Sequence, residues 1–167
     1  MSQFDKKENE WFLDELYPHE AMLRAWPGPS TECMWDGMMN VIGIGTDIVE
    51  CLRIAQMIER HGELFLGRVF TSLEIDYCSS RKAATQHYAG RWAAKEAVLK
   101  AMGTGWSRGI RWKDLEVRTE MSGKPLVQIE GTAWEICQEK GITDFQLSIS
   151  HCRSHATAFA VALGKEE

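Results

Sequence analysis

The sequence lacks a cysteine framework. Its five cysteines are odd in number and no two of them form a C-x-x-C pair, so neither a disulfide scaffold nor a zinc knuckle is expected. We expect reduced, mostly buried thiols and a cytoplasmic location, because thiols stay reduced in that compartment.

Long apolar runs and excess positive charge are also missing. No stretch approaches the ~18 consecutive apolar residues of a membrane span. The opening residues MSQFDKKENE lack the basic start and apolar run of a signal peptide. A formal net charge of −5 argues against binding to nucleic acid through bulk positive charge. We therefore expect neither a membrane nor a nucleic acid as partner.

Proline is scarce, and its distribution divides the chain. Three of the four prolines fall within residues 1–38, together with three of the seven tryptophans, eight acidic residues and three basic ones. Residues 39–167 carry 16 charges of each sign and are neutral overall. A chain of 167 residues suits one domain with an appendage. We predict an N-terminal extension of unknown role at 1–38 and a single domain at 39–167.

The hydrophobic pattern of residues 39–167 predicts both helices and strands. Helices are expected at 48–60, 63–70, 84–102 and 132–140, with a further one capped by Thr71 or Ser72. Strands are expected at 41–49, 114–119, 126–129, 145–150 and 155–163. The helix at 84–102 has a narrow alanine face that allows close packing on a sheet.

Three residues carry the clearest chemistry. Asp47 directly follows the glycine-containing strand, where a carboxylate also commonly caps a helix. Glu96 and Lys100 are four residues apart and share a helix face, as an ordinary solvated ion pair would. Asp47 and Glu96 together would make a two-carboxylate site for a divalent cation, because Mg²⁺ takes one or two carboxylates besides water and phosphate oxygens. Lys100 could neutralise the same phosphate.

A series of motifs, in fixed order and spacing, carries a resemblance to a known family. They are IGIGTDIVE at 42–50, RI at 53–54, FT with Glu74 at 70–74, GRWAAKEAVLKAMGTG at 90–105, SGKP at 122–125 and SISH at 148–151. From Met39 to about Gly164, the chain closely resembles holo-[acyl-carrier-protein] synthase, the short type of 4′-phosphopantetheinyl transferase. The resemblance implies an α+β fold, the 4′-phosphopantetheinyl transferase fold. In that fold a small, mostly antiparallel sheet packs against a long helix, and three chains assemble as a trimer.

The resemblance also implies a reaction. The family transfers 4′-phosphopantetheine from coenzyme A to a serine of apo-acyl carrier protein, and adenosine 3′,5′-bisphosphate is the other product. Asp47 and Glu96 match the positions that hold Mg²⁺ against the pyrophosphate, where a metal offsets the developing negative charge. Glu96 could also help deprotonate the serine, and Lys100 would stabilise the pyrophosphate or the leaving group.

Two further sets of residues match family positions. The coenzyme A site is implied to include Arg91, Lys100, Gly103, Gly123, Pro125 and His151. In the family the active site lies between neighbouring subunits, so these residues and the metal pair could come from different chains. An acidic carrier protein is implied to dock on Arg53 and Arg60, which lie seven residues apart on the helix after Asp47. Residues 47–113 hold 11 basic and 7 acidic residues, which suits a phosphate-rich donor and an acidic partner.

Two alternative functions stay open at this point. One is a catalytically silent trimeric relative that binds coenzyme A or a carrier protein, although a mere binder need not keep the metal pair. The other is a transferase that serves carriers of polyketide or peptide synthases instead of fatty acid biosynthesis. Longer transferases of that kind carry two fused copies of this unit, and the absence of an internal repeat favours the short type.

Overall fold

The computed structural model describes residues 40–105 and 109–164. The predicted N-terminal extension at 1–38 lies outside them. The described elements are β1 (Asn40–Glu50), α3 (Cys51–Val69), α4 (Ser72–Ser79), α5 (Ala84–Ala101), the short 3₁₀ helix η1 (Trp112–Asp114), β2 (Leu115–Thr119), β3 (Pro125–Ile129), α6 (Gly131–Glu139), β4 (Ile142–His151) and β5 (His155–Gly164). This order of helices and short strands confirms the predicted α+β class.

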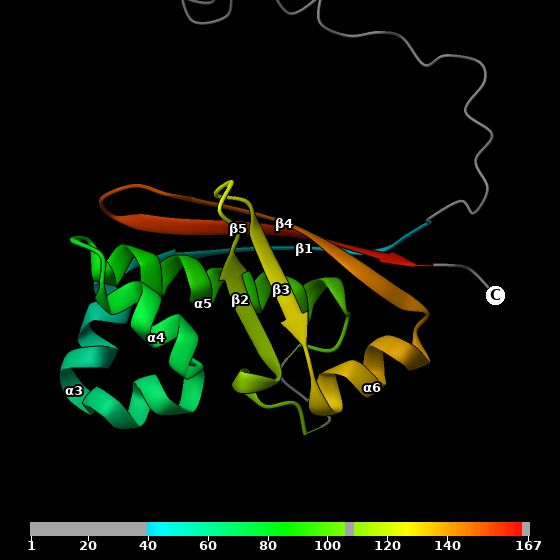
Figure 1. Ribbon diagram of the computed structural model, residues 1–167, viewed down its shortest axis with the longest axis horizontal. Helices are drawn as coiled ribbons and strands as arrows, with labels where there is room; N and C mark the ends of the chain where they lie inside the picture. Colours follow the sequence, from blue (N-terminus) through cyan, green and yellow to red (C-terminus); the bar gives the residue numbers. More distant parts are fainter. Residues whose placement is uncertain (1–39, 106–108, 165–167) are drawn as a thin grey trace, which may run out of the picture. The chain divides into compact units, whose positions relative to one another are not determined.

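The strands form two antiparallel sheets. Strand β5 lies between β1 and β4 in a three-stranded sheet, and β2 and β3 form a separate hairpin. Figure 1 shows α5 running along one face of the three-stranded sheet, with the hairpin beside the same helix. The face of β5 toward α5 is built from small residues, since Ala156, Ala158, Ala160 and Ala162 are all buried. Small side chains on a strand let a helix approach closely.

The closest approach of α5 is to β1, at two glycines. A Cβ atom added to Gly45 would lie 1.9 Å from the carbonyl oxygen of Ala97, and one added to Gly43 would lie 2.0 Å from that of Ala101. Neither distance leaves room for a methyl group, so the backbones of β1 and α5 are in direct contact. The predicted close packing of the alanine face on a sheet is confirmed, and the glycines of β1 are its counterpart.

Most element boundaries agree with the sequence expectations, while the starts of α3 and β2 differ. The helix predicted from Ile48 begins at Cys51, because β1 remains paired with β5 as far as Glu50. Gly62 has φ 48° and breaks α3 into the two helical pieces that the sequence predicts. The predicted cap of α4 is confirmed: Thr71 Oγ1 accepts from the Glu74 amide, and Glu74 Oε2 accepts from the Thr71 amide.

Asp114, predicted at the start of a strand, lies in η1 because its buried carboxylate accepts from the backbone N–H of Arg111 at 3.1 Å. Cys51, Cys78 and Cys137 are buried free thiols and Cys152 is an exposed one. None of the helices within residues 40–105 and 109–164 has the length and apolar character to cross a membrane.

The contact between β1 and α5 predicts a large effect of a single methyl group. Gly45→Ala should destabilise the fold by about 3 kcal/mol, because the added methyl overlaps backbone atoms that cannot move independently. Gly67→Ala is the matched control, since a Cβ there has nothing within 4 Å, and it should be neutral or stabilise by about 0.5–1 kcal/mol. Urea unfolding of both variants measures this, and equal effects would contradict the packing described.

Candidate active site

The residues predicted to bind the metal and the phosphate meet where α5 crosses β1. Lys100 Nζ lies 2.8 Å from Asp47 Oδ1 and donates a second hydrogen bond of 2.8 Å to the carbonyl oxygen of Thr46. The side chain of Asp47 is 16% exposed and that of Lys100 is 48% exposed. Lys100 therefore pairs across the helix–strand contact with Asp47, and its ammonium remains open to solvent.

Glu96 belongs to the same group of charges. The pKa of Glu96 is raised, chiefly by burial and then by the nearby carboxylate of Asp47, while Lys100 and Arg53 act in the opposite direction. The half-buried carboxylate of Glu96 is therefore within electrostatic range of Asp47, and a cation bound by both would relieve their repulsion. Arg53, predicted only as a docking residue, also lies within electrostatic reach of this site.

The carboxylate pair fits a hard divalent cation bound mainly by water and phosphate. Within the described ranges, no cluster of three or more His, Cys, Asp or Glu side chains could enclose a metal on its own. Two carboxylates with an open side are what Mg²⁺ uses when a phosphate completes its coordination, whereas a structural metal site would need more protein ligands. Asp47 and Glu96 are thus the residues that could hold Mg²⁺.

A second group of predicted residues surrounds a cavity near the other end of α5. The cavity has a volume of about 140 Å³ and is lined by Tyr77, His87, Gly90, Thr119, Gly123, Pro125, Ile149 and His151. Gly123 and Pro125 were predicted from one motif and His151 from another, and the β2–β3 turn and the end of β4 bring them together. Gly123 has φ 90°, a conformation that favours glycine, and no atom of the described residues beyond its chain neighbours lies within 4 Å of where a Cβ would be.

Arg91 lies directly behind this cavity. Its guanidinium carbon sits 3.9 Å from the ring centroid of Tyr77, and one terminal nitrogen donates to Thr119 Oγ1 at 3.2 Å. Arg91 is only 5% exposed, and its Nε has no hydrogen-bond partner. Among residues 40–105 and 109–164, its guanidinium forms no ion pair. A buried cation without a carboxylate is costly unless an anion joins it.

Comparison with known proteins identifies the family. Residues 43–160 match the model of the 4′-phosphopantetheinyl transferase superfamily. The chain is 46% identical over 123 residues to the holo-[acyl-carrier-protein] synthase of Rhodopirellula baltica, covering 74% of this chain and 98% of the relative. The chain belongs to the holo-[acyl-carrier-protein] synthases of this superfamily. It is therefore a phosphopantetheinyl transferase.

Solved structures of synthases share the fold described above. The holo-[acyl-carrier-protein] synthase of Neisseria meningitidis matches with a TM-score of 0.68 and 34% identity, over 74% of this chain and 98% of that one. The synthase of Bacillus anthracis, solved in complex with CoA (3′,5′-ADP), matches with a TM-score of 0.62 and 35% identity, over 77% and 100% of the two chains.

The remaining predicted residues, Arg53, Arg60 and Gly103, are not part of the cavity lining. Arg53 and Arg60 are exposed on α3, seven residues apart as the sequence indicates. Gly103 follows α5 with φ 67°, and a Cβ there would approach only Lys140 Nζ, at 3.4 Å. The cavity lining does not include Gly103, so its place in a coenzyme A site stays a prediction.

Sequence reasoning missed the two aromatic residues Tyr77 and His87 of the cavity wall and one structural ion pair. Tyr77 and His87 line the cavity, and the four-residue spacing of His87 and Arg91 on one helix is the signal that could have found His87. The ion pair joins Lys95 Nζ to Glu74 Oε2 at 2.7 Å, with both side chains fully buried.

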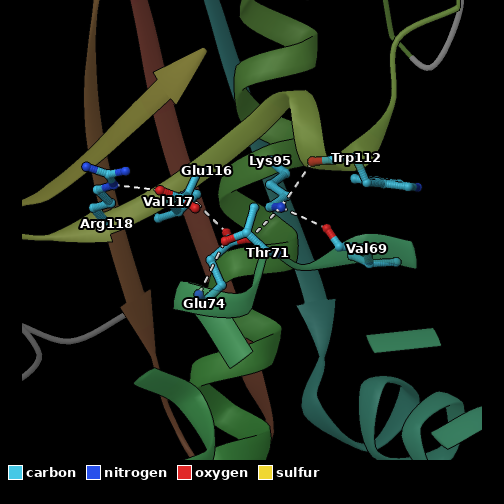
Figure 2. A network of polar contacts seen from close by, with 8 residues as sticks. All are labelled: Val69, Thr71, Glu74, Lys95, Trp112, Glu116, Val117 and Arg118. Atoms are coloured by element: carbon cyan, nitrogen blue, oxygen red, sulfur yellow. Dashed lines mark hydrogen bonds and ion pairs between the residues drawn. The ribbon is translucent and has the colours of Figure 1, made fainter. Parts of the chain in front are cut away.

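The Lys95–Glu74 pair is saturated with backbone partners (Figure 2). Lys95 Nζ donates to the carbonyl oxygens of Val69 at 2.8 Å and Trp112 at 3.1 Å. Glu74 accepts from the backbone N–H groups of Thr71 and Val117. Burial lowers the pKa of Lys95, and the charge of Glu74 partly offsets this. The pair thus ties α4, β2 and the end of α3 to the helix that carries the active site.

Removal of one partner of this ion pair should strongly destabilise the fold. Lys95→Met should destabilise the fold by about 3–5 kcal/mol, because it leaves the Glu74 carboxylate buried without a cation. Lys95→Met combined with Glu74→Gln should be less destabilised than the two single variants summed, since no uncompensated charge remains. Denaturant unfolding of the wild type and three variants measures the coupling, and additive effects would contradict the role described.

Proposed function

We propose that this chain transfers the 4′-phosphopantetheine group of coenzyme A to a serine of an apo-acyl carrier protein, in a Mg²⁺-dependent reaction. The products are holo-carrier protein and adenosine 3′,5′-bisphosphate. The observation that carries the proposal is the arrangement of Asp47, Glu96 and Lys100, two acids and an accessible ammonium at one helix–strand contact. Residues 39–167 are the transferase domain in this proposal, and the family match at 43–160 lies inside it.

The chain's own residues account for the charge and proton movements of the transfer. The serine oxygen forms a bond to the β-phosphorus of the donor while the bond from that phosphorus to the bridging oxygen breaks. Glu96, whose pKa is raised by burial and by Asp47, accepts the serine proton directly or through water. Lys100 neutralises charge on the bridging oxygen of the leaving group. Mg²⁺ held by Asp47 and Glu96 would supply electrostatic stabilisation of the pyrophosphate.

The cavity beside Arg91 is assigned to the nucleotide end of the donor. Its lining brings His151 together with the backbone of Gly123 and Pro125, and the guanidinium of Arg91 lies behind it. The related synthase of Bacillus anthracis was solved with CoA (3′,5′-ADP) bound. A buried arginine without a carboxylate and a histidine at one cavity favour an anionic nucleotide.

Mass spectrometry of a carrier protein tests the proposed transfer. Apo-acyl carrier protein incubated with the chain, coenzyme A and Mg²⁺ should gain the mass of one phosphopantetheine. Glu96→Gln should lower the rate about 10²-fold or more, because the amide can neither accept the proton nor hold the metal as a carboxylate does. Glu135→Gln, an exposed position on α6, is the control and should match the wild type.

The same assay separates the remaining alternatives. A chain that only binds coenzyme A or a carrier would give no mass gain in the wild type. A panel of fatty-acid, polyketide and peptide-synthase carriers shows which of them is modified fastest, and we propose the fatty-acid carrier as the native acceptor. The four free cysteines of the described residues suit the reducing cytoplasm, where we propose that the reaction takes place.

We further propose that the working enzyme is a homotrimer. The face of the three-stranded sheet opposite α5 exposes large apolar side chains: Ile44 is 59% exposed, Ile48 68% and Phe159 45%. A contiguous apolar face of this kind marks an interaction surface. Asp47 and His151 also lie on the two outer strands of this sheet, β1 and β4, with β5 between them. We propose that the set around Asp47 in one copy and the set around His151 in a neighbouring copy form one site.

Sedimentation tests the assembly. The wild type should sediment as a species of about 57 kDa, three times the 19.0 kDa of one chain. Ile48→Lys should lower both the mass and the activity, because a charge replaces an apolar contact. Leu73→Lys, an exposed apolar residue on α4, is the control and should remain a trimer. An active wild-type monomer would contradict the shared site.

Carrier docking is proposed for the exposed basic residues of α3. Arg60→Glu should raise the KM for the carrier protein about tenfold and leave the Kd for coenzyme A unchanged, because an acidic partner loses a complementary charge. Arg53→Glu should do the same and also move the acidic limb of the pH–rate profile upward, because Arg53 holds the pKa of Glu96 down. Arg68→Glu, beyond the Gly62 kink, is the control. Equal losses for both substrates in Arg60→Glu would contradict docking.

A further inference from the structure

The cavity beside Arg91 contains a histidine that the proposed reaction does not use. His87 lines the cavity from α5, between two other aromatic rings. Its ring centroid lies 5.4 Å from that of His151 and 5.7 Å from that of Tyr77, edge-to-face in both cases. Because a ring on either side holds it, the imidazole of His87 has a defined place at the cavity wall.

The charged groups that act on His87 are all basic. His151 comes from β4, Arg91 from α5 itself and Arg81 from the turn between α4 and α5, and all three lower the pKa of His87 in addition to burial. Arg81 and Arg91 both lie over the ring of Tyr77, with guanidinium carbons 4.4 Å and 3.9 Å from its centroid. The neighbouring groups from β2 and β3 are the uncharged Thr119 and Pro125.

The basic groups beside this cavity favour an anionic ligand. Arg91 is 5% exposed with a buried Nε that lacks a partner, and the basic groups around His87 lower its pKa in addition to burial. An anion in the cavity would instead raise the pKa of His87, because a negative charge next to an imidazole favours its protonated form. A dianionic phosphate would therefore gain a further hydrogen-bond donor as it enters.

We propose that His87 is a specificity-determining residue for the donor: it takes up a proton when a phosphate monoester dianion enters the cavity, and so favours a nucleotide that carries this group over the same nucleotide without it. The inference rests on the proposed function, and it adds a residue and a proton to the donor site. The monoester of coenzyme A is its 3′-phosphate, and 3′-dephospho-coenzyme A is the matched compound that lacks it.

Titration calorimetry without carrier protein or metal tests this inference directly. Binding of coenzyme A to the full chain at pH 7.5, in buffers of different ionisation enthalpy, should show uptake of about half a proton, and dephospho-coenzyme A should show much less. The Kd for coenzyme A should fall about threefold or more from pH 8 to pH 6.5. Wild-type binding without proton uptake would overturn the inference.

Variants of His87 assign the proton to this residue. His87→Phe keeps an aromatic ring between Tyr77 and His151 and should abolish most of the proton uptake and flatten the pH dependence of the Kd. His87→Gln should do the same if the phenylalanine variant does not fold. His61→Gln, at an exposed position on α3, is the control and should behave as the wild type. Unchanged proton uptake in the folded His87 variants would overturn the inference.

The outcome is distinguishable from a failure of the proposed function. If the carrier protein gains phosphopantetheine normally while His87 variants titrate like the wild type, only the role of His87 is wrong. If the carrier gains no mass, the transfer is wrong, whatever the calorimetry shows.

Discussion

The contact between the glycines of β1 and the backbone of α5 is the constraint on which the rest of the structure depends. With carbonyl oxygens of α5 occupying the positions where Cβ atoms of Gly43 and Gly45 would lie, helix and strand meet without intervening side chains. This close approach of α5 to β1 lets Lys100 form a hydrogen bond of 2.8 Å with Asp47. It also keeps Glu96 within electrostatic range of the Asp47 carboxylate. A wider separation would leave two ordinary surface acids and a solvated lysine.

The same helix carries the second half of the site. From the β1 contact, α5 crosses the sheet toward β4, and its first half presents His87 and Arg91 to the cavity closed by His151 and the β2–β3 turn. Lys95 lies between these two halves and points the other way, into the buried pair with Glu74 (Figure 2). Its ammonium fixes carbonyl groups of two neighbouring segments. Helix α5 thus positions both the set of residues around Asp47 and the set at the cavity, and the Lys95–Glu74 pair anchors it between the two.

Local sequence signals predicted the elements well because each depends on short-range chemistry. The capping box at Thr71 and Glu74, the break at Gly62 and the alanine face of α5 all follow from residues a few positions apart. Two motifs also singled out Asp47 and Glu96, the residues of the proposed metal pair, and the structure brings Glu96 within electrostatic range of Asp47.

Other features depend on tertiary contacts that no local pattern encodes. The Lys95–Glu74 pair joins residues 21 positions apart in two helices. In the sequence, each of them looks like an ordinary surface charge. Tyr77 and His87 enter the cavity only because α4 packs beside the first turns of α5. The end of β1 was misplaced because its pairing with β5, more than a hundred residues away, extends it to Glu50.

The central claim is that the packing of α5 on β1 creates a divalent-cation site from Asp47 and Glu96. A Mn²⁺ titration in the presence of coenzyme A, followed by electron paramagnetic resonance, tests it most directly with the wild type, Asp47→Asn and Glu96→Gln. Each variant should weaken metal binding about tenfold or more and keep the wild-type melting temperature within a few degrees. Unchanged metal affinity in both variants would contradict the account.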